Sequence, residues 1–191
     1  MYRKLWSTDI LHDNIQDEKY VHDLFTHFSS MYSDDWPTSF SGVDILNDPE
    51  HYVTLFDKLK TFVTDKVRKY HQDVFQIGDF KGIRFKTHAT NHFRIGAHQH
   101  SGSTVSGIFY VQVPDGELRL FDPRSNAIRG YPIPFHSYFK EYTISPKNGD
   151  IVMFPSYLQH EVSDNNSKMA RICLPFDCFY DDDFLDNNLQ N

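Results

Sequence analysis

The sequence has little cysteine, no long apolar run and no excess of positive charge. Its two cysteines, Cys173 and Cys178, are too few for a disulfide framework or, alone, for a tetrahedral zinc site, so we expect reduced packing residues. No stretch of about eighteen apolar residues could cross a membrane, and no apolar run follows the cations near the N-terminus. We therefore expect a soluble, cytoplasmic protein that does not bind membranes.

The charge balance argues against nucleic acid as the partner. The formal net charge is -7 and the isoelectric point is near 5.8, so the chain has no broad basic surface for a phosphate backbone. Its 191 residues suffice for one domain with a sizeable core. Seventeen Phe and eleven Tyr are more aromatic residues than a helical bundle usually needs, which favours a sheet protein.

The apolar periodicity changes near residue 80, from helical to β. We predict a helical N-terminal support over 1–78, a β core over 79–180 and an acidic tail over 181–191. The first helix should run from Asn14 to about Met31. The second should begin after Asp48, a plausible N-cap followed by Pro49, because an apolar stripe at helical spacing extends from there to Tyr70. We expect this stripe to pack on a sheet.

Short alternating segments separated by turn residues dominate the rest of the chain. The turns are Pro114-Asp115-Gly116 and Asn148-Gly149. Many short strands of this kind are typical of a sandwich or a jelly roll, so the predicted class is mainly β with N-terminal helices. The predicted strands cover residues 83–87, 105–111, 117–121, 150–154 and 171–176.

Histidine placement suggests a metal site. His98 and His100 occupy positions i and i+2, which share one face of a strand and can converge on one ion. An H-x-H pair alone is a weak signal. A third histidine, His160, follows a turn, a strand and a second turn, and a jelly roll can bring it beside the pair to form a three-point set with open positions. Among the other histidines, five in the helical half are expected to be structural: His12, His22, His27, His51 and His71.

The motif order is more specific than the histidines alone. It comprises H-Q-H-S-G-S-T-V-S-G-I-F-Y over 98–110, G-E-L-R-L-F-D-P-R over 116–124, G-D-I-V-M-F-P-S-Y-L-Q-H over 149–160, and then Arg171. From about residue 83 to 177 the chain resembles the 2-oxoglutarate (2OG) and iron(II) dioxygenase family found in phages and marine bacteria. This resemblance implies a double-stranded β-helix, iron(II), 2OG as co-substrate, and hydroxylation or a related oxidation. The substrate, a small molecule or a protein side chain, is unknown.

The resemblance also implies the metal ligands, with one departure. The wider superfamily places a carboxylate where this chain has His100, so the implied set is His98, His100 and His160. Three neutral imidazoles leave iron more positive than two imidazoles and a carboxylate would. Asp122 is an alternative carboxylate ligand, although an Asp before Pro123 is also a common turn device.

Arg171 lies close to where the superfamily places the cation that binds the distal carboxylate of 2OG. A guanidinium pairs well with a carboxylate, and this one begins an otherwise apolar strand. A surface Arg on an edge strand is the alternative. Tyr110 and Arg124 are further candidates for contact with co-substrate or substrate, although a structural role is expected for each.

Two other classes of protein fit part of the pattern. A cupin-type metalloprotein shares the H-x-H and the later histidine, but its motif expects a Glu shortly after the pair, and residues 101–107 contain no acid. A non-catalytic jelly roll of a virion or a carbohydrate-binding protein would carry the histidines incidentally. Fold alone does not separate these classes. Neither the substrate nor the oligomeric state follows from the sequence.

Overall fold

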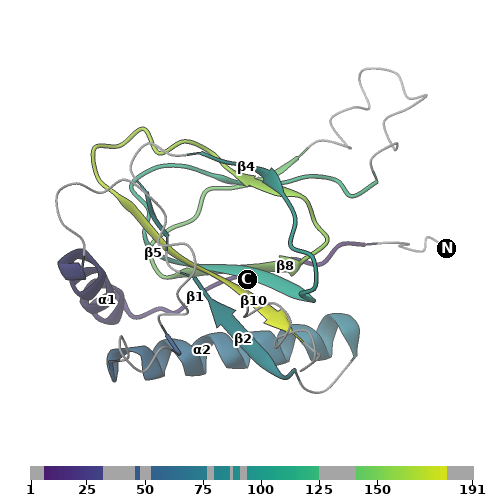
Figure 1. The fold of residues 1–191 in the computed structure, drawn as a ribbon, viewed down its shortest axis with the longest axis horizontal. Helices are drawn as coiled ribbons and strands as arrows, with labels where there is room; N and C mark the ends of the chain where they lie inside the picture. The colour runs from purple at the N-terminus through teal and green to yellow at the C-terminus, as the bar shows by residue number, and fades with distance from the viewer. Residues whose placement is uncertain are drawn as a thin grey trace.

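The computed structural model describes residues 7–31, 46–47, 53–76, 80–86, 88–90, 94–124 and 141–179. Two antiparallel sheets face each other, and the two helices lie beside the larger one (Figure 1). The smaller sheet, which contains β4, lies on the side of the larger sheet away from α2 (Figure 1). The predicted jelly-roll architecture is confirmed.

The larger sheet has six strands in the order β1-β8-β5-β10-β2, with β3 also paired to β10. Its central strands are long and are buried along nearly their whole length. The bounds are β1 Leu11–Asn14, β2 Gly82–Phe85, β3 His88–Thr90, β5 Val105–Gln112, β8 Asp150–Pro155 and β10 Arg171–Phe179.

The smaller sheet has four short strands in the order β4-β9-β6-β7. They are β4 Ile95–His98, β6 Leu118–Leu120, β7 Tyr142–Ile144 and β9 His160–Val162. His160 pairs across the ladder with His98 on one side and Leu120 on the other.

Each central strand contributes to two cores because successive side chains point to opposite faces. On β10, Cys173 lies in the core between the sheets, whereas Ile172 and Leu174 lie in the core beneath the helices. On β8, Val152 and Ile151 divide in the same way. The strand positions that face the smaller sheet are therefore the ones that can reach a site between the sheets.

Helix α1 (Glu18–Met31) and helix α2 (Leu55–Tyr70) bury their apolar stripes in the core beneath the larger sheet. A π-helical turn, His71–Phe75, continues α2. The expected first helix began too early, since Leu11–Asn14 is strand β1, which pairs with β8. Asp48 and Pro49, the proposed start of the second helix, lie outside the described residues, as does the 181–191 tail.

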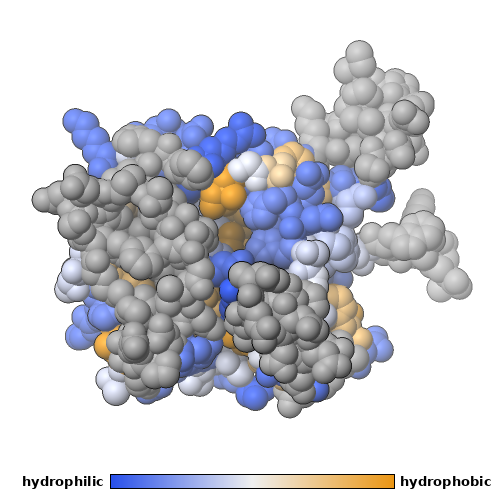
Figure 2. Space-filling model, in the orientation of Figure 1, coloured by the Kyte–Doolittle hydropathy of each residue, from blue (hydrophilic) through white to orange (hydrophobic). Residues whose placement is uncertain are grey.

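Within the described residues, no helix is long and apolar enough to cross a membrane. The described surface visible in Figure 2 is largely hydrophilic, with small separate hydrophobic areas. Cys173 and Cys178 are buried free thiols, as predicted. Burial raises the pKa of both thiols, to about 11 and about 12 respectively, so they stay protonated and unreactive at neutral pH.

Candidate metal centre

Two histidines lie on neighbouring strands of the smaller sheet. His98 ends β4, and His160 begins β9 directly opposite it in the ladder. Their ring centroids are 4.3 Å apart. The antiparallel pairing of β4 with β9 thus places two of the three predicted ligands side by side.

His100 lies just beyond the end of β4, not on the strand as the sequence analysis expected. It nevertheless reaches the same place, because its ring centroid is 5.1 Å from that of His98 and 5.2 Å from that of His160. Its backbone N–H donates to the carbonyl of Ser156 at 3.1 Å, which anchors it to the segment that follows β8 of the larger sheet.

The three imidazoles share one hydrogen-bonding arrangement. The Nδ1 atom of His98 lies 2.8 Å from the carbonyl oxygen of Gly96, and that of His160 lies 3.0 Å from the carbonyl oxygen of Leu158. The Nδ1 atom of His100 lies 2.6 Å from Oδ1 of Asp177. Each Nδ1 faces an acceptor, an arrangement that favours a proton on Nδ1 and leaves Nε2 of each ring for a metal.

The ligand nitrogens of the three histidines lie within 4.8 Å of one another. Among the described residues, these three side chains form the group of His, Cys, Asp or Glu that could hold a metal ion. His160 is buried, and the other two are half-buried. Burial, helped by the neighbouring His98 and His100, lowers the pKa of His160 to about 4 against the opposing effects of the Leu158 carbonyl and Asp177. The ring is therefore neutral at pH 7, as a metal ligand must be.

Asp177 stands behind His100 in a buried polar network. Its carboxylate accepts from the Ser106 hydroxyl at 2.7 Å, and Lys86 Nζ lies 3.4 Å away. Burial acts to raise the pKa of Asp177, but the contacts with His100, Ser106 and Lys86 outweigh it and hold the pKa below its ordinary value. The carboxylate is therefore charged where it meets the imidazole.

Asp122, the alternative ligand, is engaged elsewhere. Its Oδ1 accepts from the backbone N–H and the Nε of Arg124, each at 2.9 Å, and its Oδ2 accepts from the Arg124 guanidinium at 2.5 Å. Asp122 is not part of the histidine group described above. Arg124 correspondingly has its guanidinium on Asp122, which favours the structural role expected for it.

Arg171 is almost fully buried, with 2% of its surface exposed. Its Nη1 donates to the carbonyl of Ser163 at 3.0 Å, three positions beyond His160. A Cβ on Gly116 would lie 2.2 Å from this same Nη1, so only glycine leaves room for the guanidinium. The position on β10 and these contacts place the cation between the sheets, which excludes the surface-Arg alternative.

Tyr110, on β5, also points into the core between the sheets. It is 1% exposed, and its hydroxyl finds no hydrogen-bond partner in the described part of the chain. Burial raises its pKa well above the ordinary value, with Cys173 adding to the effect and the nearby Arg171 charge opposing it. An unpartnered buried hydroxyl close to a buried cation is what an anion-binding site would supply.

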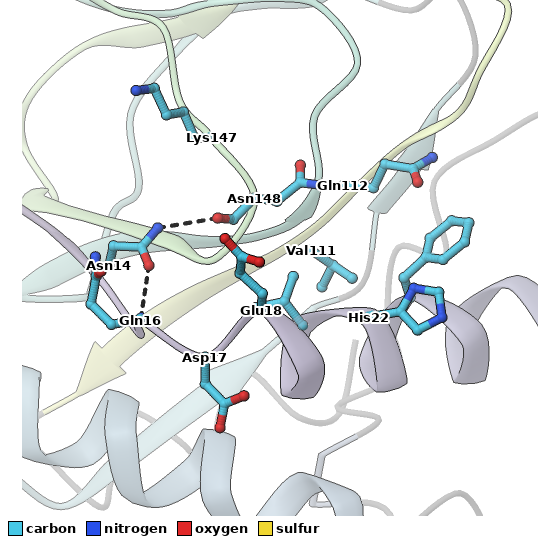
Figure 3. Close-up of a pocket in the computed structure, with 11 residues that line it drawn as sticks. Asn14, Gln16, Asp17, Glu18, His22, Val111, Gln112, Lys147 and Asn148 are labelled. Atoms are coloured by element: carbon cyan, nitrogen blue, oxygen red, sulfur yellow. Dashed lines mark hydrogen bonds between the residues drawn. The ribbon is translucent and has the colours of Figure 1, made fainter.

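A pocket of about 760 Å³ lies elsewhere, on the outer side of the larger sheet. Figure 3 shows Glu18 and His22 projecting from α1 on one side and Lys147 and Asn148 on the other. None of the three clustered histidines lines this pocket. Its mixed charges indicate no particular ligand.

The sequence comparison finds a family model that matches part of the chain. Residues 86–177, just under half of the chain, match the model of a family described as "Putative 2OG-Fe(II) oxygenase". This segment is similar to the 2OG-Fe(II) oxygenase family. The matched segment contains the three histidines, Arg171 and Asp177. No curated protein matches the sequence.

Solved structures extend the fold similarity beyond the matched segment. A prolyl-4-hydroxylase from Pseudomonas putida is 15% identical, with a TM-score of 0.64 over 92% of this chain and 94% of that one. A prolyl hydroxylase from Trichoplax adhaerens, solved with a hypoxia inducible factor peptide, is 12% identical, with a TM-score of 0.64 over 95% and 86%. The epimerase SnoN, solved with Fe³⁺, alpha-ketoglutarate and nogalamycin RO, is 10% identical, with a TM-score of 0.59 over 91% and 79%. At these identities the likeness shows the fold.

Sequence reasoning missed Asp177 and Ser106 as members of the site. A signal was present, because residues 171, 173, 175 and 177 share one face of the last strand, and a carboxylate on the buried face of a central strand needs a partner. The partner itself, His100, lies 77 positions earlier, and a contact over that separation cannot be recognised from a single sequence.

Proposed function

We propose that the chain is a 2OG- and Fe(II)-dependent dioxygenase that hydroxylates a substrate, with His98, His100 and His160 as the iron ligands. The observation that carries the proposal is the convergence of three imidazoles, whose ligand nitrogens lie within 4.8 Å of one another and each of which has an acceptor at its Nδ1. Three imidazoles in this arrangement fit a divalent first-row metal and leave positions for other ligands. Iron, when bound there, would supply the oxygen chemistry of the family.

The role of Arg171 in this proposal is to bind the distal carboxylate of 2OG. Ser163, whose carbonyl holds the guanidinium, follows His160 by three strand residues, or about 10 Å of extended chain. A five-carbon dicarboxylate chelating a metal at the histidines could span that separation. The Tyr110 hydroxyl would donate to the same carboxylate, which accounts for its lack of a partner among the described residues.

The chain's own residues would then do three things in the reaction. The histidines hold the metal, Arg171 and Tyr110 orient the co-substrate, and the apolar residues between the sheets keep water from the reacting groups. We also propose that the protein works in the cytoplasm, since its buried free thiols suit a reducing compartment.

The test is an anaerobic titration of the iron-loaded protein with 2OG, following the charge-transfer absorbance of a chelated 2-oxo acid. The parent protein should develop the band, and addition of oxygen should then yield succinate. Failure of the parent to develop the band at saturating 2OG would contradict the 2OG assignment.

Arg171→Ala should weaken 2OG binding by roughly 10- to 150-fold, because a charge-assisted pair contributes about 1.5–3 kcal/mol. Arg171→Lys should recover part of the loss, since it keeps the charge without the planar fork. Iron affinity should be unchanged in both variants. Arg94→Ala is the matched control, because Arg94 pairs with Glu161 on the outer face of the smaller sheet. Parent-like titration of Arg171→Ala would refute the assigned role.

A further inference from the structure

A carboxylate lies one imidazole away from the candidate metal position. Asp177 Oδ1 contacts Nδ1 of His100 at 2.6 Å, and both side chains are largely buried, with 7% and 17% of their side-chain surface exposed. We propose that Asp177 is a positioning residue for the metal site, which orients His100 and compensates the charge of a three-histidine centre. This inference rests on the proposed metal-binding function.

The geometry explains why His100 can stand where relatives in the superfamily carry a carboxylate ligand. An imidazole whose Nδ1–H donates to a charged carboxylate is a stronger donor at Nε2 than one that donates to a carbonyl. His98 and His160 donate to backbone carbonyls, so His100 alone has this partner. The carboxylate charge of Asp177 is thus near the metal position, but one imidazole ring farther from it than the charge of a ligating carboxylate would be.

The surroundings of Asp177 fix its carboxylate independently of any metal. The Ser106 hydroxyl donates to Oδ1, and Ser106 in turn contacts Ser156 Oγ at 2.8 Å. The Ser156 carbonyl also accepts the backbone N–H of His100. Two contacts from the larger sheet therefore hold His100, one to its backbone and one to its ring.

The first experiment compares zinc affinity, measured by competition with a chromophoric chelator, in the parent and Asp177→Asn. Asparagine keeps the shape and an acceptor oxygen but removes the charge. We expect affinity to fall roughly 10- to 100-fold, the usual effect of removing a partner of a metal-ligating histidine. Thermal melts of the metal-free proteins show whether Asp177→Asn folds.

Glu161→Gln is the matched control. Glu161 is also a buried carboxylate and is adjacent to a proposed ligand in the chain, but it pairs with Arg94 and Arg119 instead of a histidine. The zinc affinity of Glu161→Gln should equal that of the parent. If Asp177→Asn also binds like the parent, the inference is wrong while the proposed function stands; if the parent binds no zinc, the proposed function fails first.

A second measurement begins with the parent protein and gives a result even if Asp177→Asn does not fold. In zinc-loaded parent protein labelled with ¹⁵N-histidine, His100 should be protonated at Nδ1 and metal-bound at Nε2, with the most downfield Nδ1 proton of the three ligands. In Asp177→Asn that proton should move upfield, while those of His98 and His160 stay in place. Metal bonded to Nδ1 of His100 would overturn the inference.

Discussion

At the scale of single residues, the candidate co-substrate site depends on an absent side chain. Gly116 has φ of +99° and lies against the guanidinium of Arg171, where a Cβ would come within 2.2 Å of Nη1. The cation is therefore held between the Ser163 carbonyl and a glycine that leaves it room.

Gly116→Ala should displace the guanidinium while leaving Arg171 in the sequence. We expect 2OG affinity to fall by about 10-fold or more, since a displaced fork loses its bidentate geometry. Anaerobic titration of the iron-loaded variant measures this, and iron affinity should be retained. The control is Gly96→Ala, because a Cβ at Gly96 meets nothing within 4 Å. Equal 2OG affinity in the two variants would contradict the packing argument.

The residues of the site differ in how far the sequence predicted them. His98, His100 and His160 could be predicted to converge because their spacing and the turns between them carry the information, although their role as ligands stays a prediction. The buried position of Arg171 could also be predicted, since a cation in an apolar strand needs a partner. The role of Asp177 could not be predicted, because it depends on contacts with His100, Ser106 and Lys86, which come from other parts of the fold.

At the scale of elements, strand length and the turn residues beside a strand decided which strands were predictable. The five predicted strands correspond to β2, β5, β6, β8 and β10, and the longest, β5 and β10, form the centre of the larger sheet. Strands β3, β7 and β9 have only three residues each, too few for alternation to be recognised. Strand β6 is equally short but follows the Pro114-Asp115-Gly116 turn, which marked its start. Strand β1 is polar, and it joins the sheet edge through contacts of His12 and Asn14 with Asp150 that only the fold creates.

Helix α2 supports the larger sheet from the side opposite the site. Leu59 is fully buried in the core shared by the helices and the sheet. Leu59→Ala should therefore lower the free energy of unfolding by about 2–5 kcal/mol, through lost burial and the cavity left behind. Chemical denaturation of the metal-free protein measures this. Asp65→Ala, on the exposed side of α2, should change stability by less than about 0.5 kcal/mol.

Zinc binding by the same variant separates the structural role of α2 from a role in the metal site. Leu59 lies in the core on the helix side of the sheet, and the histidines lie on the other side, so folded Leu59→Ala should bind zinc with the affinity of the parent. Loss of zinc binding by a variant that is still folded would mean that α2 shapes the metal site directly.

At the scale of the whole molecule, the candidate metal position joins the two sheets. His98 and His160 belong to the smaller sheet, whereas His100 is held by Ser156 and Asp177 from the larger one. Separation of the sheets must therefore break the ligand set. A metal bound at this position would bind the folded state and have no equivalent site in the unfolded chain.

Zinc should accordingly stabilise the protein as a whole. At a free zinc concentration about 100 times the Kd, the linkage adds about 2.7 kcal/mol to the free energy of unfolding. For a chain of this size that corresponds to a rise in Tm of about 5–11 °C, because each kcal/mol shifts Tm by roughly 2–4 °C. Calorimetry with and without zinc measures the rise, and 2OG alone should produce little of it. His98→Ala should melt at the same temperature with and without zinc, since it removes a ligand from the smaller sheet. A rise of equal size in His98→Ala would place the stabilising zinc at another position and would contradict the bridging of the two sheets.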